Sequence, residues 1–92
     1  MHMDHTEQMT DLKKIEGQIR GVQKMIETKR YCVDILTQLH SVVGAIFNVE
    51  DKILDRHLQG CVSQALRGKS DTEKQKKINE ILQLLKRFRK RS

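Results

Sequence analysis

The chain has 92 residues, of which 33% are charged, and it contains one tyrosine, two phenylalanines and neither tryptophan nor proline. We expect residues 1–92 to form a single domain with a small core of its own, because a short chain with few aromatic side chains buries little apolar surface. Self-association is therefore expected. The net charge of +6 and the pI near 9.6 favour a polyanionic partner.

The sequence also argues against several classes of protein. No apolar run looks long enough for a signal peptide or a membrane span, so we expect no membrane partner and a cytoplasmic location. In that compartment Cys32 and Cys61 should stay reduced. An enzyme with a small-molecule substrate is not expected, because no acid–base pair, phosphate-cradling loop or catalytic triad is visible.

A first amphipathic helix is predicted over about residues 6–29. Gly17 and Gly21 lie four positions apart on it, and each costs up to about 1 kcal/mol of helix propensity relative to alanine. Close backbone packing is one explanation for them, and an incidental presence is the other. The apolar residues alternate by three and four positions, as in a helix–helix contact; they are Leu12, Ile15, Ile19, Val22 and Ile26.

A second helix is predicted over about residues 31–67, ending before Gly68, which is a favourable residue for a helix C-terminus. Its apolar residues spread over more than one side, so more than one side must be covered. The first helix can cover one flank, and another subunit is needed for the other. The apolar set is Val33, Ile35, Leu36, Leu39, Val42, Val43, Ile46, Phe47, Val49, Ile53, Leu54, Leu58, Val62, Ala65 and Leu66.

A third helix is predicted over about residues 71–90, because Ser70 and Glu73 form the S-x-x-E pattern of a capping box. The chain is therefore expected to be all-α. The basic residues that follow Phe88 are interpreted as a solvated end that complements the helix dipole, with contact to phosphate as the less favoured alternative.

The spacing of three side chains suggests a metal site. His57 and Cys61 are one helical turn apart, so an imidazole nitrogen and a thiolate can face the same ion. Cys32 lies 25 positions before His57. At ~1.5 Å per residue, a continuous helix puts these two residues roughly 37 Å apart. An antiparallel second copy can bring Cys32 beside the other two, so the predicted site lies between subunits.

The donor types favour a soft metal but leave alternatives open. Two thiolates and one imidazole suit Cu(I), whereas Zn(II) usually takes a fourth ligand, which His2 or His5 could supply. Zinc, nickel and cobalt therefore remain alternatives. Cysteines on apolar helix faces are also often simple core residues, so spacing alone does not decide the matter.

Three segments in order along the chain resemble one known family. They are LKKIEGQIRGV at residues 12–22, YCVDILTQL at residues 31–39, and HLQGC at residues 57–61. The chain resembles the copper-sensing operon repressors (CsoR/RcnR-like), in particular their copper-sensing branch. The resemblance implies a three-helix protomer, a dimer formed as an antiparallel four-helix bundle, and two dimers paired as a homotetramer.

The resemblance also implies a function. A metal-responsive transcriptional repressor of this type binds double-stranded operator DNA when metal-free and is released on binding Cu(I). The metal ligands of the copper-sensing branch fall on Cys32, His57 and Cys61 of this sequence. Tyr31 and Glu80 match residues that lie just outside the ligand set and orient it.

The expected DNA contacts differ in part from the family pattern. Two basic residues that commonly face DNA are replaced by Asp11 and Asn48. No recognition helix or base-stacking aromatic set is visible, so the positive charge suits phosphate contacts and groove shape. The candidate DNA-contacting residues are Lys13, Lys14, Arg20 and Lys24.

Three other functions compete with the Cu(I) sensor. One is a repressor of the same family that senses nickel, cobalt or zinc. Another is a thiol sensor in which Cys32 and Cys61 of opposite chains form a disulfide or polysulfide bridge, a chemistry that needs no His57. The third is a metal-buffering or purely structural helical oligomer without a DNA role.

Overall fold

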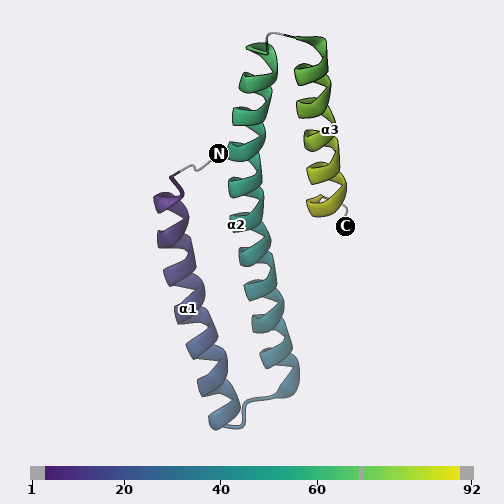
Figure 1. The fold of residues 1–92 in the computed structure, drawn as a ribbon. Coiled ribbons are helices and arrows are strands. Elements are labelled where there is room, and N and C mark those ends of the chain that lie inside the picture. Colours follow the sequence, from purple (N-terminus) through teal and green to yellow (C-terminus); the bar gives the residue numbers. More distant parts are fainter. Residues whose placement is uncertain (1–3, 69, 90–92) are drawn as a thin grey trace. The chain divides into compact units, whose positions relative to one another are not determined.

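The protein is described by a computed structural model that covers residues 4–68 and 70–89. It contains three helices, α1 (Thr6–Glu27), α2 (Cys32–Leu66) and α3 (Asp71–Phe88), in that order (Figure 1). No strand occurs among the described residues. The predicted all-α fold of three helices is confirmed.

The chain divides into two compact units, and the boundary falls inside α2, between Lys52 and Ile53. The first unit contains α1 and the part of α2 up to Lys52. The second contains the rest of α2 and α3, which run side by side (Figure 1). That residues 1–92 act as one domain stays a prediction.

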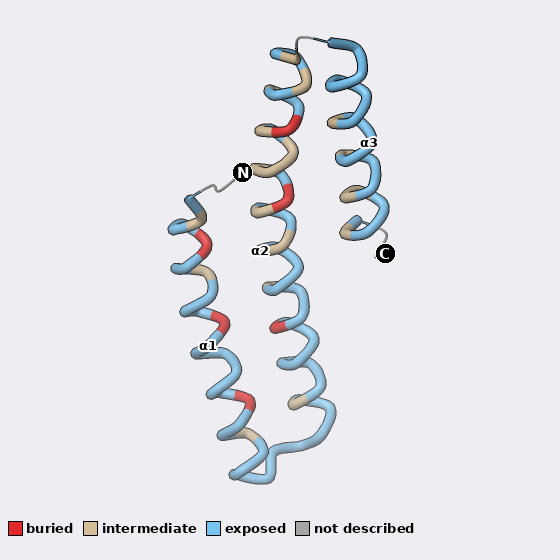
Figure 2. The backbone as a smooth tube through the Cα atoms, in the orientation of Figure 1, coloured by how far each residue is buried: buried red, intermediate tan, exposed pale blue. Residues whose placement is uncertain are grey.

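Burial within the first unit follows the heptad spacing of packed helices. On α1, Ile15 and Val22 are buried, and on α2, Val42 and Val49 are buried. Each pair is separated by seven residues, or two helical turns, so each helix presents one narrow apolar seam. Figure 2 shows this sparse burial on α1 and α2. The single chain thus has the small core that its composition predicts.

The first helix ends two residues earlier than predicted, at Glu27, because Lys29 has the left-handed conformation with φ of 55°. The amide of Lys29 donates to the carbonyl of Ile26 at 3.1 Å, and the amide of Arg30 donates to the carbonyl of Met25 at 2.9 Å. These two bonds form a Schellman motif, which usually has glycine at the left-handed position. Lysine carries no sequence signal for this conformation, so the prediction missed it.

The glycines of α1 are not explained by packing inside the chain. A Cβ atom added to Gly17 or Gly21 would meet nothing within 4 Å among the described residues. Close approach of another backbone, one of the two explanations considered from the sequence, therefore does not occur within the single chain.

Gly68 follows α2, but it is needed for space and not for a left-handed turn. Its φ is not positive. A Cβ atom at Gly68 would lie 3.1 Å from Cγ of Lys74 and 3.2 Å from the carbonyl oxygen of Ala65. The chain therefore passes close to the first turns of α3 at this point, and a larger residue would push Lys74 away.

The third helix starts where the capping box predicts. The Ser70 hydroxyl oxygen accepts a hydrogen bond from the amide of Glu73 at 3.2 Å, and Ser70 has extended backbone angles. This bond satisfies one of the amide groups left free at a helix N-terminus. The capping bond therefore fixes the residue at which α3 begins, a few residues after the end of α2.

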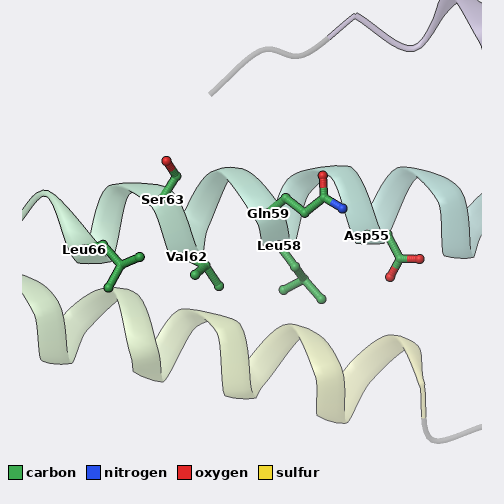
Figure 3. Close-up of a pocket in the computed structure, with 6 residues that line it drawn as sticks. All are labelled: Asp55, Leu58, Gln59, Val62, Ser63 and Leu66. Atoms are coloured by element: carbon green, nitrogen blue, oxygen red, sulfur yellow. The ribbon is translucent and has the colours of Figure 1, made fainter.

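Much of the apolar surface of the described chain is exposed. A groove of about 440 Å³ follows the last turns of α2, and Figure 3 shows Leu58, Val62 and Leu66 on the side of α2 toward α3. Large apolar side chains that remain exposed are Met9, Leu12, Ile19, Ile26, Tyr31, Val33, Leu36, Leu39, Val43, Ile46, Phe47, Val62, Leu66, Ile78 and Leu82. Large exposed apolar side chains in such number are typical of a surface that packs against a partner.

By length and composition, α2 could also cross a membrane. An 18-residue window has mean hydropathy 1.4, and 11% of that window is buried within the chain. No membrane span was predicted from the sequence, because polar residues interrupt the apolar residues of this helix. A helix that is apolar on several sides suits the core of an oligomer equally well.

Candidate metal centre

Three potential metal ligands come together in the second unit. His57 and Cys61 are on α2, one turn apart, and Glu80 is on α3. One ligand atom from each lies within 4.8 Å of the others. The helical spacing of His57 and Cys61 therefore does place both donors on one face, as the sequence predicted.

Glu80 links the cluster to a neighbouring lysine. One carboxylate oxygen, Oε1, lies 3.6 Å from Nε2 of His57, and the other, Oε2, lies 3.3 Å from Nζ of Lys77. The hydrogen bond from Lys77, with the imidazole of His57 adding to it, lowers the pKa of Glu80 below its ordinary value of 4.5. Glu80 is therefore a carboxylate at neutral pH and can accept from both partners.

Cys61 is the only residue among those described whose side chain is fully buried. Burial raises the pKa of its thiol above the ordinary value of 9.0, and the negative charge of Glu80 raises it further, against the opposing charge of Lys77. The metal-free protein therefore holds Cys61 as a thiol near neutral pH. A metal ion that binds there must displace the proton.

Cys32 does not join this cluster in the single chain. It is the first residue of α2, it is exposed, and it belongs to the unit that ends at Lys52. Its neighbour Tyr31 is 68% exposed. The structure therefore brings together two of the three predicted ligands, His57 and Cys61, and adds Glu80. The exposed thiol of Cys32 belongs to the other unit.

The donors at the cluster fit a metal ion that accepts nitrogen and sulfur. The imidazole of His57 is a borderline ligand and the thiolate of Cys61 a soft one, which suits Cu(I) or Zn(II). The exposed position of Glu80 and its two existing partners favour a supporting role for the carboxylate. One more sulfur would complete a ligand set typical of Cu(I).

The sequence matches the family described as metal-sensitive transcriptional repressor over residues 4–87. The chain belongs to the metal-sensitive transcriptional repressor family. Members of this family are repressors and not enzymes, they bind DNA, and they associate into oligomers.

Individual relatives agree with this assignment. The copper-sensing transcriptional repressor CsoR of Bacillus subtilis (strain 168) is 46% identical over 79 residues, which is 86% of this chain and 75% of that protein. The copper-sensing repressor CsoR with Cu(I) from Geobacillus thermodenitrificans NG80-2 has a similar structure, with a TM-score of 0.74, 38% identity, and coverage of 98% of this chain and 95% of that one. The resemblance to copper-sensing repressors that the sequence indicated is confirmed.

A nickel-responsive protein is also structurally similar. The nickel-responsive transcriptional regulator InrS has a TM-score of 0.81 and 31% identity, with 96% of each chain covered. The fold of this repressor therefore occurs with more than one sensed metal. The identity of the metal must be argued from the donors.

Among the described residues, His5 is not part of the cluster. His2 lies outside the described residues. His5 is half-buried in the first unit, and its Nδ1 has no hydrogen-bond partner among the described residues. A fourth ligand from His2 or His5 stays a prediction.

The basic residues predicted to face DNA are all exposed on α1. Helix geometry places Lys13, Arg20 and Lys24 opposite the buried seam of Ile15 and Val22. Arg20 also contacts Glu16 at 3.5 Å, with both side chains mostly exposed. Surface pairs of this kind contribute little, so Arg20 remains available to a phosphate.

Several ion pairs were not predicted from the sequence, and two of them involve residues of the candidate sites. The ion pair between Lys77 and Glu80 has i,i+3 spacing on α3, so helical periodicity alone could have indicated it. The ion pair between Asp11 and Lys52 joins α1 to α2 at 2.9 Å and carries no local sequence signal.

Proposed function

We propose that this repressor binds operator DNA when metal-free and is released when Cu(I) binds at a site shared between two subunits. The ligands are Cys32 of one subunit with His57 and Cys61 of another. The observation that supports this proposal is the division of the donors: His57 and Cys61 form a cluster, and Cys32 remains exposed at the other end of the same helix.

The exposed apolar face of α2 supports the assembly that such a site requires. Side chains such as Leu36, Leu39 and Val43 are at least 43% exposed in the single chain. Covering them with a second antiparallel copy gives a four-helix bundle in which α1 and α2 of each chain take part. Two-fold symmetry then places two equivalent sites in each dimer. We further propose that two dimers pair as a homotetramer.

The arrangement around His57 indicates how a metal signal could reach α3. Its Nε2 atom is the one that faces Glu80, so Nδ1 is left to bind the metal. Glu80 then holds the imidazole in place from α3, and Tyr31 is carried beside the site together with Cys32. A change in the position of His57 is thus passed to α3 through one carboxylate.

The DNA-binding surface is proposed to be the exposed basic face of α1. Lys13, Lys14, Arg20 and Lys24 suit contacts to phosphate oxygens. Coupling of about 1–3 kcal/mol between metal and DNA binding would release most of the protein from an operator. A cytoplasmic location follows from this role, and it keeps both thiols reduced.

Nickel is the second candidate, and the similarity to InrS favours it. Glu80 offers a harder oxygen donor, and His5 could add nitrogen. The thiol-sensor alternative is less favoured, because a disulfide or polysulfide would not need the contact of His57 with Glu80.

The test is a titration of Cu(I) into the protein bound to duplex DNA of its own promoter. Release of DNA in step with copper binding is expected for the wild type. The variants Cys32→Ser, His57→Ala and Cys61→Ser should bind DNA but fail to release it with copper. Unchanged DNA affinity in the copper-loaded wild type would exclude the proposal. X-ray absorption with Cu(I), Ni(II) and Zn(II) in turn would separate the candidate metals by sulfur count and coordination number.

A further inference from the structure

A small groove with both polar and apolar lining residues lies between α1 and α2 within the first unit. Its volume is about 170 Å³, and the buried side chains of Ile15 and Val49 form part of its lining. Lys14 lines it from α1 and Asn48 from α2. The groove is open to solvent at its rim, because Lys14 and Asn48 are both exposed.

The rim of the groove carries the donors that a phosphate group requires. Lys14 and Lys52 each offer an ammonium group, and Gln18 and Asn48 each offer an amide that can donate. Phosphate oxygens of a nucleic-acid backbone accept hydrogen bonds from these groups. The rim also contains one polar side chain with no hydrogen-bond donor, the carboxylate of Asp11.

One of the two ammonium groups, that of Lys52, already forms an ion pair with Asp11. Its Oδ2 atom lies 2.9 Å from Nζ of Lys52, and the side chains are 29% and 54% exposed. Exposed ion pairs contribute little to stability, so this contact is not required to hold α1 against α2. Its main effect is electrostatic: it neutralises Lys52 and places a negative charge where a phosphate would approach.

We propose that the groove between α1 and α2 is a DNA-phosphate subsite and that Asp11 is a built-in competitor of the phosphate, holding Lys52 and lowering the affinity for DNA. This inference rests on the proposed DNA-binding function and extends its surface from α1 to Lys52 on α2. A phosphate entering the groove must displace the carboxylate from Lys52. The operator complex is thereby kept weak enough for a modest metal signal to dissociate it.

The test measures affinity of the metal-free protein for promoter duplex over a range of salt concentrations. Asp11→Asn keeps the size of the side chain, removes the negative charge and frees Lys52. We expect binding tighter on the order of tenfold, with the slope of log K against log salt steeper by about 0.9 for each lysine freed. Because phosphate carries no sequence information, the same gain is expected on a duplex of unrelated sequence.

The matched control is Asp34→Asn. This change also removes one negative charge and breaks an exposed ion pair, that of Asp34 Oδ2 with Arg30 Nη2 at 3.8 Å. It lies outside the groove, so its DNA affinity should stay within about twofold of the wild type by the small weight of a distant surface charge. Equal gains in Asp11→Asn and Asp34→Asn would show a general charge effect and overturn the inference.

A second variant assigns the gain to Lys52. In Asp11→Asn/Lys52→Gln the increase in affinity and in salt slope should disappear. Lys52→Gln alone leaves the Asp11 carboxylate unpaired in the groove, so it should bind DNA more weakly than the wild type. A gain that persists without Lys52 overturns the inference, as does an unchanged affinity in Asp11→Asn with unaltered thermal unfolding. If the wild type binds DNA and releases it with Cu(I) in those cases, the proposed function survives. If the wild type binds no DNA, both fall together.

Discussion

At the scale of single residues, the chemistry of the cluster of His57, Cys61 and Glu80 depends on the contacts of the carboxylate and on the proton of the thiol. Glu80 holds an imidazole on one oxygen and a lysine on the other. Cys61 is fully buried beside that carboxylate. The cluster is therefore an acceptor-rich pocket around a neutral thiol, and an arriving cation replaces the thiol proton.

The raised pKa of Cys61 predicts that copper binding depends on pH. The thiol pKa lies above 9.0, so the metal-free protein keeps this proton over the whole neutral range and releases it when metal binds. For each proton released, the apparent affinity should rise about tenfold per pH unit between about pH 6 and pH 8. Competition with a Cu(I) chelator, whose own pH dependence is known, measures this slope. An affinity that does not change with pH would contradict a protonated Cys61.

Glu80 is predicted to transmit the metal signal. Glu80→Gln preserves the shape of the side chain but weakens its interaction with both His57 and Lys77. Copper should still bind through the thiolates, with affinity lower by about tenfold to a hundredfold, as for other residues that orient a ligand. The DNA complex should respond much less to bound copper. Lys77→Gln, which leaves the contact of His57 with Glu80 in place, is the control and should retain most of the response.

The sequence predicted some of these residues and not others, for physical reasons. His57 and Cys61 follow from helical periodicity, because four residues make about one turn. Glu80 could be reached only through the family resemblance, since its partner His57 is on another helix. The pair of Asp11 and Lys52 joins residues 41 positions apart, so only packing reveals it. Cys32 has the spacing expected of a ligand from a second subunit, and its place in the site stays a prediction.

At the scale of helices, hydrogen bonds and backbone angles determine where each helix begins and ends. Some of these helix ends can be predicted from the sequence and others cannot. Ser70 is recognisable as an N-terminal cap because its hydroxyl accepts from the amide of Glu73, and the start of α3 was predicted from it. The end of α1 was not, because a lysine takes the position where glycine is usual. Gly68 was interpreted as a favourable residue for the C-terminus of the second helix. It does follow α2, and its lack of a side chain allows close packing against Lys74.

The unusual conformation of Lys29 predicts a stabilising substitution. Its φ of 55° is unfavourable for a residue with a Cβ atom and is ordinary for glycine. Lys29→Gly should therefore raise the free energy of unfolding by about 0.5–1 kcal/mol, measured by denaturant titration. Gln23→Gly, inside α1, is the matched control and should lower it by about 1 kcal/mol. A loss of stability in Lys29→Gly would show that the left-handed turn carries no strain.

At the scale of the whole molecule, the burial of the chain indicates that it is one subunit of an assembly. Its interior is sparse, and α2 exposes apolar residues along most of its length. Exposed apolar residues occur on all three helices and are most numerous on α2, which suits a bundle of several copies around a common core. The same association that covers this surface would supply the missing sulfur ligand.

The most direct measurement of the shared site is copper binding by hybrid oligomers. Neither Cys32→Ser nor Cys61→Ser should form the complete site alone. In a hybrid dimer, one site carries both substitutions and the other is intact, so unfolding and refolding the two variants together should restore Cu(I) binding with two sulfur ligands. The control mixture, His57→Ala with Cys61→Ser, leaves a defect in every site and should restore none. Recovery in the first mixture only is the predicted result. Failure of that recovery, or a complete two-sulfur site in Cys32→Ser by itself, would contradict a site built between subunits.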